Sequence, residues 1–133
     1  MAATTTDRNT LVRDGTTFED PVAASANIHS GAIVCLDASG NAVPASTSTG
    51  LTARGRAEEA RDNTSGLAGS LTVPVRAGVF RYGNDGTIDR THIGKTVYLV
   101  DDQTLAATNG IGTLSAAGVC KDVDAVGVWV LIG

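Results

Sequence analysis

Short runs of apolar residues, broken every few positions by Gly, Asn or Asp, recur from about residue 28 to the end of this chain. An apolar run at 32–36, a turn cluster at 37–41 and a return through Ala42 and Val43 predict a β-hairpin. At 51–61 small residues alternate with charged ones, which predicts another strand, although the AEEAR portion alone would suit a helical turn. The pattern is typical of a chain built from strands.

The rest of the sequence continues this pattern. After an exposed loop at 62–70, two strand-like pieces flank Ala77 and Gly78, and Pro74 predicts that the first lies at a sheet edge or contains a bulge. The final strands are expected at 96–100, 114–121 and 126–132. Many short strands with frequent turns predict an all-β barrel or sandwich.

At most one short helix is expected, at about 87–93. Thr87 can cap it, Asp89 lies in the first turn, where the helix dipole favours an anion, and Gly94 ends it. The segment would join two strands.

Residues 1–26 differ in composition from the remainder. They are rich in Thr and hold only isolated apolar residues with no helical or alternating period. We therefore expect an extended N-terminal arm at 1–26 and a single β domain at 27–133. Leu11, Val12, Phe18 and Val22 favour an arm that docks on a partner, and the alternative is a disordered tail.

Composition narrows the possible partners. Only five side chains are aromatic, so the core must rely on Val, Ile, Leu and Ala, and neighbouring subunits could add stability. With 10 Lys and Arg against 14 Asp and Glu, the chain carries a net charge of -4, which disfavours nucleic acid binding. No apolar run approaches the ~20 residues of a membrane span, and no secretory signal follows Met1. We therefore expect no membrane partner, and we expect the protein to be made in a cytoplasm. Cys35 and Cys120 lie in apolar strand patterns and are interpreted as buried, reduced thiols.

Motifs that would indicate catalysis or ligand binding are incomplete. Gly94–Thr96 reads GKT, but a phosphate-binding loop needs a glycine at the position of Asp89 and a helix rather than a strand afterwards. The Asp85-Gly86 pair resembles the middle of a calcium loop, yet Arg81 and Gly83 occupy the expected ligand positions. We therefore predict no catalytic residue, no cofactor and no metal ligand, and no enzymatic function.

Four stretches of the chain carry a resemblance to a known family. They are GAIVCLDASGNAVPAS, GRAEEARDNTSG, VPVRAGVFRY, and the last third, with IGKTVYLVDD and DVDAVGVWV. From about Gly31 to the end, the sequence resembles capsid decoration, or cement, proteins encoded beside the major coat protein in tailed bacteriophages and prophages, including Mu-like phages.

The resemblance implies a compact β-barrel-like or β-tulip-like fold that trimerises on the outside of an icosahedral shell. The expected partners are the phage major capsid protein and two further copies of the chain, and the expected location is the outer surface of the virion. The arm would reach onto coat subunits. The family supplies no catalytic motif to carry over.

Candidate contact residues come from this chain itself. The arm is expected to contact coat protein, by backbone addition to a sheet edge and by apolar side chains entering pockets, through Thr4, Thr5, Thr6, Arg8, Leu11 and Val12. The trimer interface is expected at Arg54, Gly55 and Arg56, since small residues permit close approach and the guanidinium fork suits contacts between proteins.

The sequence leaves two other functions open. A β-rich adhesin or fibre-tip module binding a host surface ligand would expose aromatic residues in its loops, and the loops at 37–41, 62–70 and 101–109 hold none. A small hydrolase using His29 or His92 is conceivable because triads assemble in space, but no sequence motif supports it.

Overall fold

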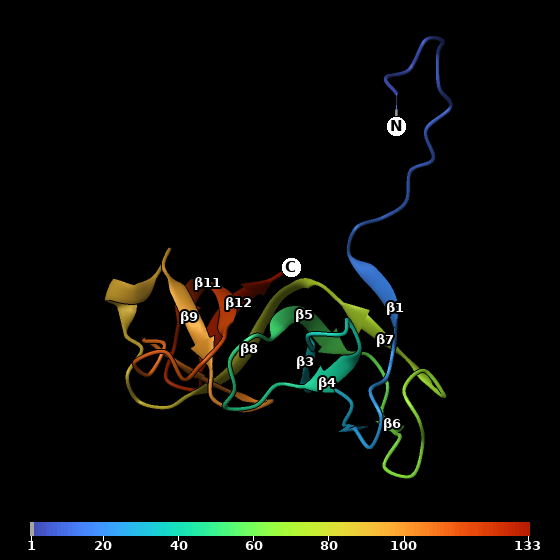
Figure 1. The fold of residues 1–133 in the computed structure, drawn as a ribbon. Coiled ribbons are helices and arrows are strands. Elements are labelled where there is room, and N and C mark those ends of the chain that lie inside the picture. The colour runs from blue at the N-terminus through green and yellow to red at the C-terminus, as the bar shows by residue number, and fades with distance from the viewer. Residues whose placement is uncertain (1) are drawn as a thin grey trace.

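The computed structural model describes residues 2–133 and confirms an all-β fold that contains a small closed barrel (Figure 1). Met1, the first residue of the expected arm, lies outside the described residues. The strands, in chain order, are β1 (Thr17–Pro21), β2 (Asn27–Ile28), β3 (Ile33–Leu36), β4 (Ala42–Pro44), β5 (Thr52–Ala57), β6 (Arg61–Asp62), β7 (Thr72–Arg76), β8 (Gly78–Asn84), β9 (Thr96–Leu99), β10 (Thr104–Ala106), β11 (Ala116–Val123) and β12 (Val128–Ile132).

One half of the molecule is a five-stranded sheet in the order β1-β7-β5-β3-β4, with the β2-β6 pair beside it. The predicted hairpin is confirmed as β3 and β4, which pair antiparallel. Its turn forms because the Asp37 carboxylate accepts hydrogen bonds from the backbone N–H groups of Ser39 and Asn41. Local turn chemistry therefore fixes the register of this edge of the sheet.

The other half is a closed barrel of five strands in the order β10-β8-β12-β11-β9. Its longest strand, β11, shifts register between Ala116 and Gly118 and again between Cys120 and Asp122. Such irregularities bend a strand and increase its twist, which allows so few strands to close. The barrel occupies the left of Figure 1 and the open sheet the right, and β8 continues from β7 to connect them.

The short helix expected at 87–93 is present as a single 3₁₀ turn, η1 (Arg90–His92). It is capped by Asp89 rather than by Thr87, which the sequence suggested. The Asp89 carboxylate accepts from the Thr91 N–H, and the His92 ring accepts from the Asp89 N–H. The span between the cap and Gly94 is too short to nucleate an α-helix.

Two other predictions about strands were incomplete or wrong. β10 was not predicted, because its three residues show no alternation. Pro74 lies inside the sheet, since β7 runs between β1 and β5. Proline has no backbone N–H to donate, and this is tolerated here because the pairing between β5 and β7 ends at Ala57 and Val75. Beyond the end of β5, the Pro74 carbonyl still accepts a hydrogen bond from the Glu58 N–H.

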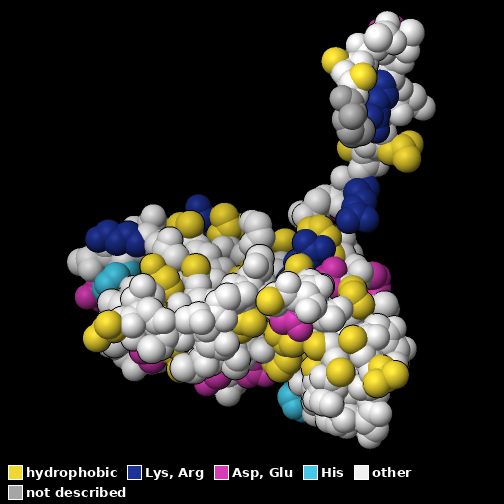
Figure 2. Space-filling model, in the orientation of Figure 1, with side chains coloured by type: hydrophobic (Ala, Val, Ile, Leu, Met, Phe, Trp, Pro, Cys, Tyr) yellow, Lys and Arg dark blue, Asp and Glu magenta, His cyan; other side chains and the backbone are white. Residues whose placement is uncertain are grey.

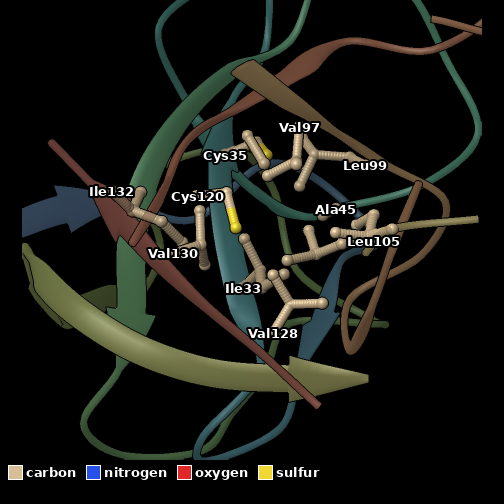
Figure 3. Packing of buried hydrophobic residues seen from close by; sticks show 12 residues of the cluster. Ile33, Cys35, Ala45, Val97, Leu99, Leu105, Cys120, Val128, Val130 and Ile132 are labelled. Carbon is tan, nitrogen blue, oxygen red and sulfur yellow. The ribbon is translucent and has the colours of Figure 1, made fainter. Parts of the chain in front are cut away.

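Two hydrophobic clusters fill the interior, and Val43 packs against both. The larger cluster lies in the barrel and includes Ile33 and Cys35 from the open sheet (Figure 3). Cys120 belongs to the same cluster, and both cysteines are free thiols with no exposed surface. Burial raises the pKa of the Cys35 thiol to about 12 and also raises that of Cys120.

These thiols should be unreactive while the protein is folded. Iodoacetamide at pH 8 is expected to leave native protein unmodified and to alkylate both Cys35 and Cys120 in denaturant, because the thiolate is the reactive form and burial suppresses it. Intact mass spectrometry with and without denaturant measures this. Rapid alkylation of the native protein would contradict the buried positions.

Candidate interaction surface

Residues 2–16 extend away from the sheet, and Figure 2 shows them as a thin projection that carries hydrophobic and basic side chains. All of them are exposed, including the predicted coat-contact residues Thr4, Thr5, Thr6 and Arg8. Leu11 and Val12 are 90% and 94% exposed. The structure therefore places the predicted arm contacts together on one exposed segment, which is tied to the domain at its end, where the Thr16 carbonyl accepts a hydrogen bond from the Ala77 N–H.

The arm is shorter than the sequence indicated. The last part of the expected arm, from Thr17 onwards, belongs to the folded domain, because β1 pairs with β7 along its whole length. Val22 has no exposed surface, and Ala23 and Ala26 are also buried in the smaller cluster. The pairing partner of β1 lies more than 50 residues later in sequence, at Thr72–Arg76, which is why local composition did not reveal it.

An ion pair between Arg54 and Asp20 holds β1 against β5, next to the point where the arm leaves the sheet. Arg54 on β5 donates two hydrogen bonds to Asp20, from Nε at 2.8 Å and from an η nitrogen at 3.1 Å. Its guanidinium also lies 3.5 Å from the centre of the Phe18 ring. Asp20 is 7% exposed, so this two-bond pair replaces the water that the carboxylate loses on burial. Arg54 thus holds β1, the strand that follows the arm, in place on the sheet.

The residues predicted for the trimer interface all have roles within one chain. Arg56 pairs with Glu58 at 2.7 Å and lies over the Phe80 ring at 4.7 Å. Gly55 is buried, and a methyl group at its α-carbon would overlap the carbonyl oxygen of Arg76. The close approach that this glycine permits is therefore made to β7 of the same chain.

A concave site of about 570 Å³ lies between the open sheet and the barrel, lined by His29, Arg81, Tyr82 and Asp102 among others. The Tyr82 hydroxyl donates to the Gly31 carbonyl at 2.7 Å, and burial raises the pKa of Tyr82 to about 12, so its phenol stays protonated near neutral pH. Arg81 faces Asp124 at 3.6 Å. Two of the polar side chains of this site, Tyr82 and Arg81, are thus engaged by neighbours in the chain.

The remaining candidate chemistry concerns metal ligands, the two histidines and membrane-spanning helices. Among residues 2–133, no group of three or more His, Cys, Asp or Glu side chains is arranged to hold a metal ion. Ser30, next to His29, donates to the Glu58 carbonyl at 3.5 Å, and His92 is occupied in the Asp89 cap. Within the same residues, no helix is long and apolar enough to cross a membrane.

Asp124 organises the turn between β11 and β12. Its carboxylate accepts from the indole N–H of Trp129 at 3.0 Å and from the backbone N–H groups of Val126 and Gly127. These bonds, led by the one from Trp129, lower the pKa of Asp124 to about 2 from an ordinary 3.8. Hydrogen bonds from Thr64 and Thr91 likewise lower the pKa values of Asp62 and Asp89.

Folding stability should therefore depend on acid pH through these carboxylates. A lowered pKa gives stability that is complete above the unfolded value and is lost as the pH falls towards the folded value, here from about 3.8 towards 2 for Asp124. Asp124→Asn should flatten the fall in thermal midpoint across this window, with Asp62 and Asp89 supplying the rest. Melting curves from pH 6 to pH 2, followed by Trp129 fluorescence and by circular dichroism, test this. Asp7→Asn on the exposed arm is the control, and an unchanged slope in Asp124→Asn would contradict the prediction.

Comparison with known proteins gives no relative. No protein-family model, no curated protein and no solved structure matches the chain.

Proposed function

We propose that this protein is a structural virion protein that decorates and stabilises the outside of a bacteriophage capsid. It bridges subunits of the major coat protein, acts as a homotrimer and uses its arm as the attachment segment. The sequence resemblance to capsid decoration proteins motivates this assignment. The observation that carries it is the arm, residues 2–16, with Leu11 and Val12 almost fully exposed.

An exposed arm of this kind has a physical reason to bind. Two adjacent aliphatic side chains in water gain free energy when they enter pockets on another protein, and the extended backbone around them can pair with a sheet edge. Attachment by several arms of one oligomer multiplies the effect, because the second and third contacts are intramolecular. Arm binding therefore suits a protein that clamps neighbouring subunits of a shell.

The rest of the molecule fits a passive scaffold. The domain is a barrel fused to a sheet, its two thiols are buried, and Tyr82 and Arg81 of its concave site are engaged with Gly31 and Asp124. Arg54, Gly55 and Arg56 serve contacts inside the chain, so the trimer of this proposal would use other surfaces in addition to, or in place of, that strand.

Binding to isolated shells tests the proposal. Purified protein is titrated onto empty shells of the major coat protein, and bound protein is measured after sedimentation. Saturation at a fixed ratio of copies per coat subunit is expected, with native mass spectrometry of decorated shells showing mass added in units of three chains. Absence of binding would refute decoration, and addition of single chains without three-fold grouping would refute the trimer.

A further inference from the structure

Ile111 occupies an unusual place in the fold, at the tip of the loop between β10 and β11. Among the described residues, only Ser25 and Ile111 are non-glycine residues with positive φ, and Ile111 has φ of 59°. A β-branched side chain in this left-handed region is strained because its Cβ substituents crowd the backbone. Ile111 is also fully exposed to solvent. Neither packing nor backbone preference within this chain accounts for an isoleucine here.

The loop holds Ile111 in a fixed position. Gly110 and Gly112 on either side also have positive φ, at 62° and 77°, so three successive residues form a left-handed turn. The Asn109 carbonyl accepts from the N–H groups of Thr113 and Leu114, both at 2.9 Å. The Asn109 side chain accepts from the Gly112 N–H at 3.3 Å, and the Thr113 hydroxyl donates to the Gly110 carbonyl at 2.9 Å. The side chain is thus presented at the tip of a hydrogen-bonded turn.

The chemistry around Ile111 limits what it can contact. From Gln103 to Val119 the chain has no ionisable side chain, although 18% of all residues are charged. A lipid surface would be bound by several apolar residues with basic ones beside them, and this loop has no basic residue. A second copy offers the concave site of about 570 Å³, but its lining places the charged Arg81 and Asp102 beside the apolar Ala32 and Val126, and a neutral aliphatic side chain entering it would separate those charges from water. An apolar pocket on a different protein is the matching environment.

We infer that the Ile111 turn is a second attachment point, separate from the arm, and that Ile111 inserts into a neutral apolar pocket on the coat-protein shell. This inference rests on the proposed function, because it takes the shell as the partner. The turn is formed before binding, so little conformational entropy is lost when it docks. The backbone strain at Ile111 is retained because the exposed side chain is used by the partner.

The test uses Ile111→Asn in the full chain. Asparagine tolerates the left-handed conformation and cannot fill an apolar pocket, so binding and strain are separated. The variant should bind shells of the major coat protein on the order of 10- to 100-fold more weakly, the loss expected when one aliphatic side chain is no longer buried. Its thermal midpoint should equal or exceed that of the wild type. Leu67→Asn is the matched control, since Leu67 is 79% exposed in another loop and does not itself have a positive φ, and it should bind as the wild type does.

Each result decides between alternatives. If wild-type protein does not bind shells, both the proposed function and this inference fail. If wild type and Ile111→Asn bind shells equally, only this inference fails. A lowered thermal midpoint in Ile111→Asn would show a structural role and overturn the inference. A change in oligomer mass in Ile111→Asn with unchanged shell affinity would also overturn the inference, because it would identify a second copy as the partner. A loss of co-sedimentation with phosphatidylcholine vesicles in the same variant would overturn it as well, because it would identify lipid as the partner.

Discussion

Deleting residues 2–12 should weaken attachment to coat-protein shells by about 1 to 4 kcal/mol while leaving the thermal midpoint of the free protein nearly unchanged. The deleted residues are all exposed, so no packed contact of the domain is lost. Shell binding loses the burial of Leu11 and Val12 and any backbone pairing made by the extended segment. A binding titration and a melting curve on the same two preparations measure the two effects.

Smaller changes to the arm separate its side chains from its backbone. The double variant Leu11→Ser with Val12→Ser should reproduce most of the loss in affinity. Replacing Thr4, Thr5 and Thr6 by Ser is the matched control, because it keeps the extended backbone and the hydroxyl groups. Full affinity after the deletion would remove the arm from the attachment mechanism. A lower thermal midpoint after the deletion would mean that residues 2–12 support the fold.

Gly55→Ala should destabilise the free protein by about 3 kcal/mol, which is large for the addition of one methyl group. The new methyl group would overlap the Arg76 carbonyl oxygen, and backbone atoms of β7 cannot move aside without breaking the pairing of Arg76 with Arg56 and with Thr17. Chemical denaturation of wild type and variant at low protein concentration gives the difference.

Gly55 itself has a φ of 156°, which side chains rarely adopt, and two other glycines separate this cause from the overlap. A methyl group at Gly15 meets no atom within 4 Å and involves no positive φ, so Gly15→Ala should be close to neutral. Gly50 also has open space but a φ of 76°, so Gly50→Ala should cost only about 1 kcal/mol, from its backbone conformation. If Gly55→Ala kept full stability and lost only oligomer formation, Gly55 would serve the contact between chains that the sequence suggested.

The parts of the fold that were predicted correctly are those that depend on neighbouring residues. The hairpin of β3 and β4 follows from an apolar run and from Asp37, which bonds to backbone groups two and four residues ahead. β11 and β12 are also close in sequence and joined by a turn that Asp124 stabilises. In each case the information lies within about ten residues, where periodicity and turn chemistry can be read directly.

The parts that were missed depend on distant partners. β10 pairs in parallel with β8 at Thr104 and Leu105, and three residues cannot display a period. β1 has a charged residue facing inward, Asp20, and only the position of Arg54 on β5 explains how that carboxylate is accommodated. Arg54 was expected to make bidentate contacts between chains, and in the structure its bidentate partner, Asp20, lies in the same chain.

The candidate site was predictable in part for the same reason. Leu11 and Val12 stood out in sequence as apolar residues in a polar segment, and they are exposed in the structure. Ile111 gave only a weak signal, the glycines on either side of it, because positive φ at a β-branched residue arises from the hydrogen bonds of the whole turn.

The attachment of β1 also determines how the arm can bear a mechanical load. In Figure 1 the arm leaves the sheet from the start of β1, and all five residues of that strand are paired with β7. Since hydrogen bonds between antiparallel strands run perpendicular to the strands, a pull along β1 loads these pairs in shear, so that they resist together rather than opening one by one. Asp20 and Arg54 pass part of the same force on to β5. Under the proposed function, pressure that pushes neighbouring shell subunits apart would therefore be opposed by the sheet as a whole, while the arm itself could stay thin.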